Sequence, residues 1–262
     1  TGTGTGVINF NGSAAQNFNQ SGVLVNDVDF NVDNSAGVTF SNSTTITGAL
    51  SLTSGILTIP NGVTVTIANG TTIGGSGFGG SKHINTQVGG ATHGFLQVNN
   101  MPALGAYTLP MGNGTSYLPA TLTPAISSSF SVGVFTGITE DGLPNGTAFT
   151  AAKKAGVVDA VWTINRNSGT SCDMTLGWPA SLEGATFATY TSTQIGISHW
   201  DNPNWGTSVG TGDNTLNTAT RSGVSVFSPF GVGKTPYVLP IKFNYLNAAK
   251  GNGYNTLNWK AT

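Results

Sequence analysis

Short runs of alternating apolar and small polar residues, separated by glycines, dominate this chain. In residues 48–75 a glycine recurs every seven or eight positions, and Val63, Val65 and Ile67 alternate with threonines. Because successive side chains on a strand face opposite sides, this pattern predicts strands with one buried face. Three such strands fill the 22 residues from 48 to 70, which predicts the three-sided coils of a short parallel β-solenoid.

A second pattern follows the glycine-rich residues 74–80. Phe130, Val132 and Val134 alternate strictly with small residues, and similar runs recur between turn residues up to position 227. Their spacing predicts an antiparallel β-sandwich. Residues 151–155 are the one helix candidate, of a single turn at most.

The last part of the chain predicts a hairpin. Residues 239–243 and 255–259 read as two strands across a turn at 250–253, as at the start of an immunoglobulin-like domain. The predicted fold is therefore all-β, and we expect a piece of a longer, exported polypeptide. The predicted domains are 1–80 (β-solenoid), 81–236 (β-sandwich) and 237–262 (start of the immunoglobulin-like domain).

Composition narrows the function classes. Charged residues are 7% of the chain, against roughly 25% in an ordinary soluble domain. A net charge of −1 does not suggest a basic surface that would bind nucleic acid or an anionic membrane. No stretch is apolar enough to span a bilayer. Cys172 is the single cysteine, which excludes an internal disulfide.

The order of these patterns resembles that of large secreted surface proteins of Bacteroidetes-type bacteria, exported by the type IX route. Residues 34–40 and 46–57 are similar to the strand repeats of those proteins. Residues 109–112 (Leu-Pro-Met-Gly) and 117–119 (Tyr-Leu-Pro) resemble the "F-P-V-G … Y-x-P" module that follows the repeats.

The C-terminal residues carry the same resemblance. Residues 239–241 (Leu-Pro-Ile) and 257–262 (Leu-Asn-Trp-Lys-Ala-Thr) are similar to the "L-P-V … L-x-W-x-T" entry of an immunoglobulin-like domain. The resemblance implies an extracellular, cell-surface location and a role in adhesion or structural display. It carries over no catalytic residue.

Two short segments are candidate binding sites. Trp200 and Trp205 flank a loop and could stack on sugar rings, although packing against the sandwich is the competing interpretation. Glu140, Asp141 and Asn145 lie in a tight loop and are candidate calcium ligands, with an ordinary turn as the alternative.

No catalytic constellation is evident. Glu140 and Asp141 are adjacent, whereas the carboxylates of a glycosidase stand roughly 5–9 Å apart across one bond. His83, His93 and His199 are the only histidines in the sequence; the first two lie ten residues apart with no carboxylate beside them, whereas a zinc site needs three or four converging ligands. We therefore expect a non-enzymatic protein without a cofactor, calcium being the one candidate ion.

The sequence favours an adhesive or structural segment of a surface protein or filament, with neighbouring modules or further copies as partners. The alternative is a carbohydrate-binding module of a secreted glycan-degrading enzyme, with surface glycans as ligands. A β-helix polysaccharide lyase comes third, since nine Lys and Arg residues scattered over 262 positions do not suggest a basic groove.

Overall fold

The fold is all-β, as the alternating patterns predict. A computed structural model describes the chain except residues 1–5, 23, 25, 236–242, 251–254 and 262. Strands account for 51% of the described structure and helices for 6%.

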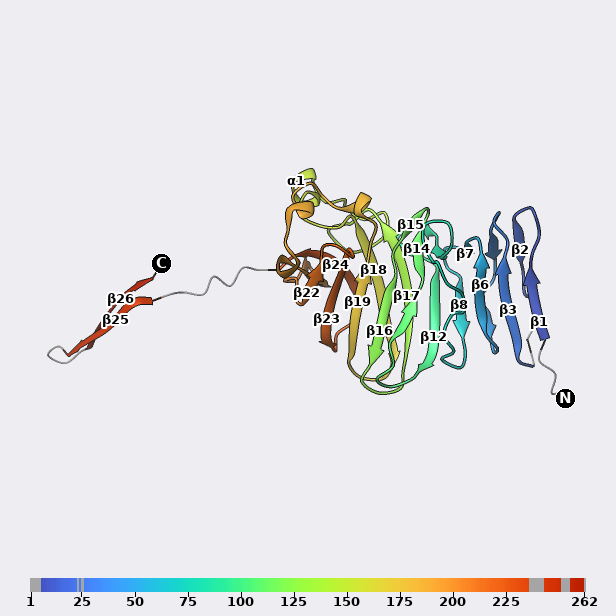
Figure 1. Ribbon diagram of the computed structural model, residues 1–262, viewed down its shortest axis with the longest axis horizontal. Coiled ribbons are helices and arrows are strands. Elements are labelled where there is room, and N and C mark those ends of the chain that lie inside the picture. Colours follow the sequence, from blue (N-terminus) through green and yellow to red (C-terminus); the bar gives the residue numbers. More distant parts are fainter. Residues whose placement is uncertain (1–5, 23, 25, 236–242, 251–254, 262) are drawn as a thin grey trace.

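The N-terminal part is a stack of parallel strands in three ladders (Figure 1). The first ladder contains β1 (Gly6–Phe10), β3 (Val28–Asp33) and β6 (Leu50–Ser54). The second contains β2 (Gln16–Phe18), β4 (Val38–Phe40), β7 (Leu57–Ile59), β9 (Ile84–Thr86) and β14 (Met111–Asn113). The third contains β5 (Thr44–Ile46), β8 (Thr64–Ile67) and β12 (Phe95–Met101).

The register of this parallel stack follows the spacing in the sequence. Gln16 lies opposite Val38, an offset of 22 residues, and Thr44 lies opposite Val65, an offset of 21. On the outside of the first ladder, Asn31 Nδ2 donates to Asn9 Oδ1 (3.2 Å). Apolar side chains thus point inward, while polar side chains hydrogen-bond from one strand to the next along the stack.

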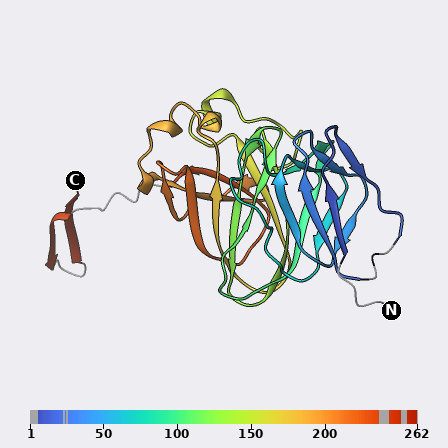
Figure 2. The same cartoon turned by 45° about the vertical axis from the view of Figure 1, so that its right-hand side comes forward.

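The second half of the chain is an antiparallel sandwich (Figure 2). One layer extends the third ladder from β12 through β17 (Ser128–Thr136), β18 (Ala160–Ser168), β24 (Pro229–Lys234), β20 (Ile195–Asp201) and β21 (Asn204–Trp205). The facing layer contains β13 (Tyr107–Leu109), β16 (Ala120–Pro124), β19 (Cys172–Gly177), β23 (Thr218–Val224) and β22 (Thr211–Asp213).

The parallel stack and the sandwich share a sheet and a core. Strand β12 pairs in parallel with β8 on one side and antiparallel with β17 on the other. One cluster of buried side chains runs from Phe10 to Val232. The boundary predicted at residue 80 falls in the loop between β8 and β9, and strands from both sides of it share sheets and one buried cluster.

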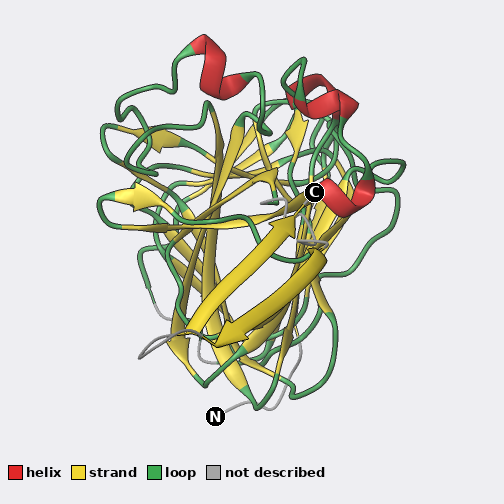
Figure 3. Cartoon of the chain, turned by 90° about the vertical axis from the view of Figure 1, so that its left-hand side faces the viewer, coloured by secondary structure: helices red, strands yellow, loops and turns green. Residues whose placement is uncertain are grey.

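Helical turns are few, and they gather at one end of the strands (Figure 3). The predicted turn at 151–155 is confirmed as α1 (Ala151–Lys154). The others are 3₁₀ turns: η1 (Ala180–Leu182), η2 (Phe187–Thr189) and η3 (Ser192–Gln194). Within the described residues, no helix has the length and apolarity needed to cross a membrane.

The remaining described strands each pair antiparallel with a neighbour in the chain. Strands β10 (Val88–Gly89) and β11 (Thr92–His93) pair with each other, and β15 (Ser116–Tyr117) pairs with β14. The predicted C-terminal hairpin is formed by β25 (Phe243–Lys250) and β26 (Asn255–Ala261), which pair antiparallel. Residues 239–242, assigned to its first strand in the prediction, lie outside the described residues.

Candidate functional site

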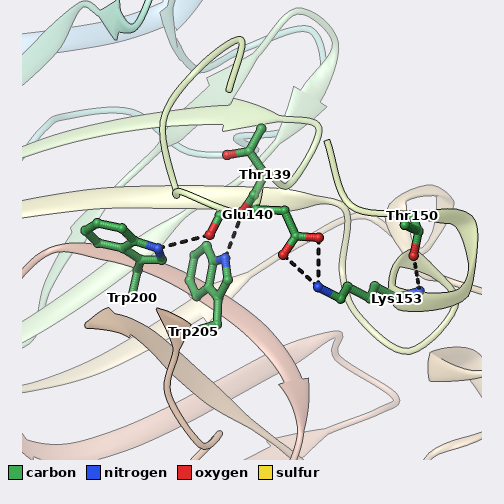
Figure 4. Close-up of polar contacts among 6 residues, drawn as sticks. All are labelled: Thr139, Glu140, Thr150, Lys153, Trp200 and Trp205. Atoms are coloured by element: carbon green, nitrogen blue, oxygen red, sulfur yellow. Dashed lines mark hydrogen bonds and ion pairs between the residues drawn. The ribbon is translucent and has the colours of Figure 1, made fainter. Parts of the chain in front are cut away.

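The two candidate tryptophans lie opposite each other in the β20–β21 hairpin. Trp200 pairs with Trp205 across a turn that contains a cis Asn202–Pro203 bond. Both indole N–H groups donate to one loop: Trp200 Nε1 to the carbonyl of Glu140 (3.0 Å) and Trp205 Nε1 to the carbonyl of Thr139 (2.8 Å) (Figure 4). The hairpin is thereby fastened to the loop that carries the candidate calcium ligands.

The structure gives the three candidate calcium ligands separate partners. Glu140 forms an ion pair with Lys153, both carboxylate oxygens lying 2.8 Å from Nζ. Asp141 Oδ1 accepts from the backbone N–H of Leu143 (3.1 Å), and Asn145 Nδ2 donates to the carbonyl of Gly90 (2.8 Å). Of these contacts only that of Asp141 is local to the turn, since Lys153 and Gly90 lie 13 and 55 positions from their partners.

No metal site is assembled elsewhere in the described part of the chain. Among those residues, no three His, Cys, Asp or Glu side chains gather closely enough to hold an ion. His83 and His93 are buried, and burial lowers the pKa of each imidazole below its usual value. His93 Nε2 lies 3.0 Å from Thr163 Oγ1, and its Nδ1 lies 2.8 Å from the carbonyl of Gly94. Both histidines therefore belong to the packing of the strands.

A pocket of about 490 Å³ lies on the outer face of the sandwich, beside Trp205. Its walls are the apolar side chains of Ile138, Phe149, Val157 and Trp205. The rings of Phe149 and Trp205 meet edge to face, with centroids 6.4 Å apart and planes at 87°. Trp200 does not line this pocket. The structure thus separates the two tryptophans, which the sequence presents as an equivalent pair.

Two glycines of β24 contribute to the pocket and leave room for the side chains above them. A Cβ at Gly231 would lie 3.2 Å from both Trp205 Cζ3 and Ile138 Cδ1. A Cβ at Gly233 would lie 3.3 Å from both Ser208 Oγ and Val157 Cγ1. Because alternate residues of β24 face the core, these glycines face outward and bring its backbone close to the pocket.

Polar groups complete the lining. Ser198, Thr207, Ser208 and Thr235 contribute hydroxyl groups, and Lys234 contributes the one charged side chain. Ser198 Oγ donates to the carbonyl of Gly206 (2.7 Å). The pocket is therefore apolar on its walls and hydroxyl-rich elsewhere, as is common for sites that bind small molecules.

Of this lining, sequence reasoning found Trp205 alone. A faint signal for the glycines was present, since Phe230-Gly231-Val232-Gly233 alternates a bulky apolar residue with glycine. The contributions of Phe149, Val157 and Ser208 had no local signal, because Ser208 lies more than fifty residues after Phe149 and Val157 in the chain and no motif records their approach in the fold.

A comparison of the chain with protein-family models, curated proteins and solved structures finds no match.

Proposed function

We propose that this chain is a non-catalytic structural or adhesive segment of an extracellular surface protein. In this proposal the parallel stack is a short β-solenoid whose β1/β2 end joins a neighbouring β module or a second copy. The observation that carries the proposal is the open edge of the three parallel ladders at that end.

Each ladder begins with a strand paired on one side. Among the described residues, β1, β2 and β5 are the terminal strands of their sheets. An edge strand presents alternate N–H and C=O groups that can pair with another chain. Because Gly6 N donates to Asp27 O, alternation along β1 directs the N–H groups of Val7 and Asn9 outward.

The side chains at this end suit the addition of a further coil. Phe10 and Phe18 lie over Phe30 and Phe40, with ring centroids 5.0 to 6.2 Å apart. Phe18 is half-buried, so an apolar surface accompanies the unpaired backbone. On the outside, Asn9 ends a row of hydrogen-bonded side chains that continues through Asn31 to Ser51. Rows of hydrogen-bonded polar side chains of this kind stabilise neighbouring strands.

The opposite end of the stack is covered. Strand β14 is followed by β15, and β12 is followed by β17, both antiparallel. The first ladder ends on Gly74, which exchanges backbone hydrogen bonds with Leu50 and Leu52. This arrangement supports one joining end for the stack, with the sandwich at the other end. It gives less support to a filament that grows through both ends of the stack.

The test is the association state of the 262-residue chain and of two variants at one exposed position. Val7 is 58% exposed, and its N–H points away from β3. We expect sedimentation to show concentration-dependent dimers for the wild type. Val7→Pro removes the outward donor and should abolish them, because proline is tolerated on an edge but cannot donate.

Val7→Thr is the matched control, because it removes an apolar side chain while keeping the N–H donor. We expect this variant to dimerise about as well as the wild type. A strictly monomeric wild type, or equal association of the proline and threonine variants, would contradict strand addition at β1.

A further inference from the structure

We propose that the pocket beside Trp205 binds a neutral sugar ring. The proposal concerns the sandwich and does not depend on the joining end proposed above, because β1 and the pocket belong to different parts of the fold. A pyranose has an apolar C–H face and a rim of hydroxyl groups, and this pocket pairs an apolar wall with hydroxyl groups in the same way.

The size and walls of the pocket suit such a ligand. Its volume of about 490 Å³ falls within the range of roughly 300–1,000 Å³ that is typical of small-molecule sites. Trp205 and Phe149 supply aromatic surface, and Ile138 and Val157 add aliphatic surface. Burying one face of a ring against these side chains removes apolar area from water on both partners.

One hydroxyl group in this pocket has no hydrogen-bond partner among the described residues. Ser208 is 7% exposed and lines the pocket, and its Oγ lies 3.3 Å from the Cβ position at Gly233. No described residue forms a hydrogen bond with this Oγ. Because a serine hydroxyl can both donate and accept a hydrogen bond, this group is available to a ligand hydroxyl.

The charge of the lining favours a neutral ligand over a cation. No carboxylate is among the described residues that line the pocket, so a bound cation would have no counter-charge. Lys234 lies with Nζ 5.4 Å from the centroid of the Tyr190 ring. Its ammonium group is thus already engaged, and the other polar groups of the lining are hydroxyls and backbone.

Trp205 is held in place before any ligand arrives. Its Nε1 donates to Thr139 O, and the six-membered ring lies against Gly231. A fixed ring loses little conformational freedom on binding, which strengthens binding to a preformed site. Trp200 forms the equivalent bond with Glu140 O but lies outside the pocket.

The two tryptophans therefore provide a matched pair of variants. Glucose, galactose, mannose and N-acetylglucosamine, each also as its β-linked disaccharide, are titrated into ¹⁵N-labelled protein and followed by NMR. We expect saturable shifts for at least one sugar, with a Kd in about the millimolar range or tighter. Shifts should concentrate on Gly231, Gly233 and Ser208.

Trp205→Phe should weaken binding at least about tenfold, whereas Trp200→Phe, which also removes one indole N–H bond, should change it less than about twofold. Ser208→Ala should weaken binding about five- to tenfold, as expected for one lost hydrogen bond. Thermal unfolding of each variant verifies the fold. The proposal is overturned if no sugar binds saturably, if both tryptophan variants lose binding equally, or if only hydrophobic probes such as anilinonaphthalene sulfonate enter the pocket.

Discussion

Gly55 allows two successive turns of the parallel stack to approach each other at a corner. Its φ is +79°, and a Cβ there would lie 1.8 Å from the carbonyl oxygen of Asn34. Asn34 is 1% exposed. Its Nδ2 donates to Ala14 O (2.8 Å) and Gln16 Oε1 (2.9 Å), and its Oδ1 accepts from the N–H of Ala36 (2.9 Å). Any side chain at position 55 must therefore displace a corner that is already hydrogen-bonded.

Gly62 provides the control, because it differs from Gly55 in one respect. Its φ is +74°, but no atom lies within 4 Å of the position that a Cβ would occupy. Alanine in the left-handed region is disfavoured by about 1–2 kcal/mol at either position. Gly62→Ala should therefore lower the free energy of unfolding by about that amount.

Gly55→Ala adds the displacement of Asn34. The backbone bonds from Asn34 N to Ser54 O (3.3 Å) and from Gly37 N to Asn34 O (2.9 Å) are weakened or lost. A buried backbone group left without a partner costs about 1–3 kcal/mol. The total for Gly55→Ala is then about 4 kcal/mol, roughly 3 kcal/mol more than for Gly62→Ala.

The two variants are compared by urea and thermal unfolding, with hydrogen exchange to locate the effect. At about 2–4 °C per kcal/mol, the melting temperature of Gly55→Ala should lie roughly 6–12 °C below that of Gly62→Ala. Faster exchange should appear first at residues 30–57. If the two variants agree within about 1 kcal/mol, the close approach at Asn34 does not hold the corner, and the reasoning fails.

Further predictions concern pH, the thiol and calcium. Burial lowers the pKa of His83 and His93 in the folded state, so the unfolded chain takes up protons first as the pH falls below about 6.5. The free energy of unfolding should therefore be highest above that pH and should decline below it, by up to about 1.4 kcal/mol per pH unit for each histidine. Urea midpoints that stay constant between pH 7.5 and 5 would contradict this. Burial also raises the pKa of the Cys172 thiol to about 12, so alkylation at pH 8 should require unfolding, and rapid labelling of the native protein would be inconsistent with this burial. Because Lys153 occupies both carboxylate oxygens of Glu140, millimolar calcium should shift the melting temperature by less than about 1 °C, and a rise of several degrees would show that the loop binds the ion.

The sequence by itself determined the local structure of this protein. Alternation such as that of Val63, Val65 and Ile67 predicts a strand with one buried face. These three side chains are buried in the structure. The turn at Ala151–Lys154 and the pairing of β25 with β26 were also predictable, because both depend on contacts between neighbours in the chain.

Only the tertiary structure decided how the strands combine. The sheet passes from parallel to antiparallel pairing at β12, whose partners β8 and β17 lie on either side of it in the chain. The spacing of apolar residues shows which face of a strand is buried but does not show which strand it pairs with. The sequence therefore predicted a boundary at residue 80, although the buried cluster contains side chains from both sides of it.

The candidate site depends on tertiary structure to a still greater degree. Trp200 and Trp205 are indistinguishable in sequence, yet only Trp205 lines the pocket, because Gly231 of a distant strand leaves space for its ring. Glu140 is a candidate calcium ligand in the sequence, and only the structure shows that Lys153 of α1 forms an ion pair with it. The pocket, including the Ser208 hydroxyl, forms where loops that are distant in the chain come together. A hydrophobic period along the chain carries no information about such contacts.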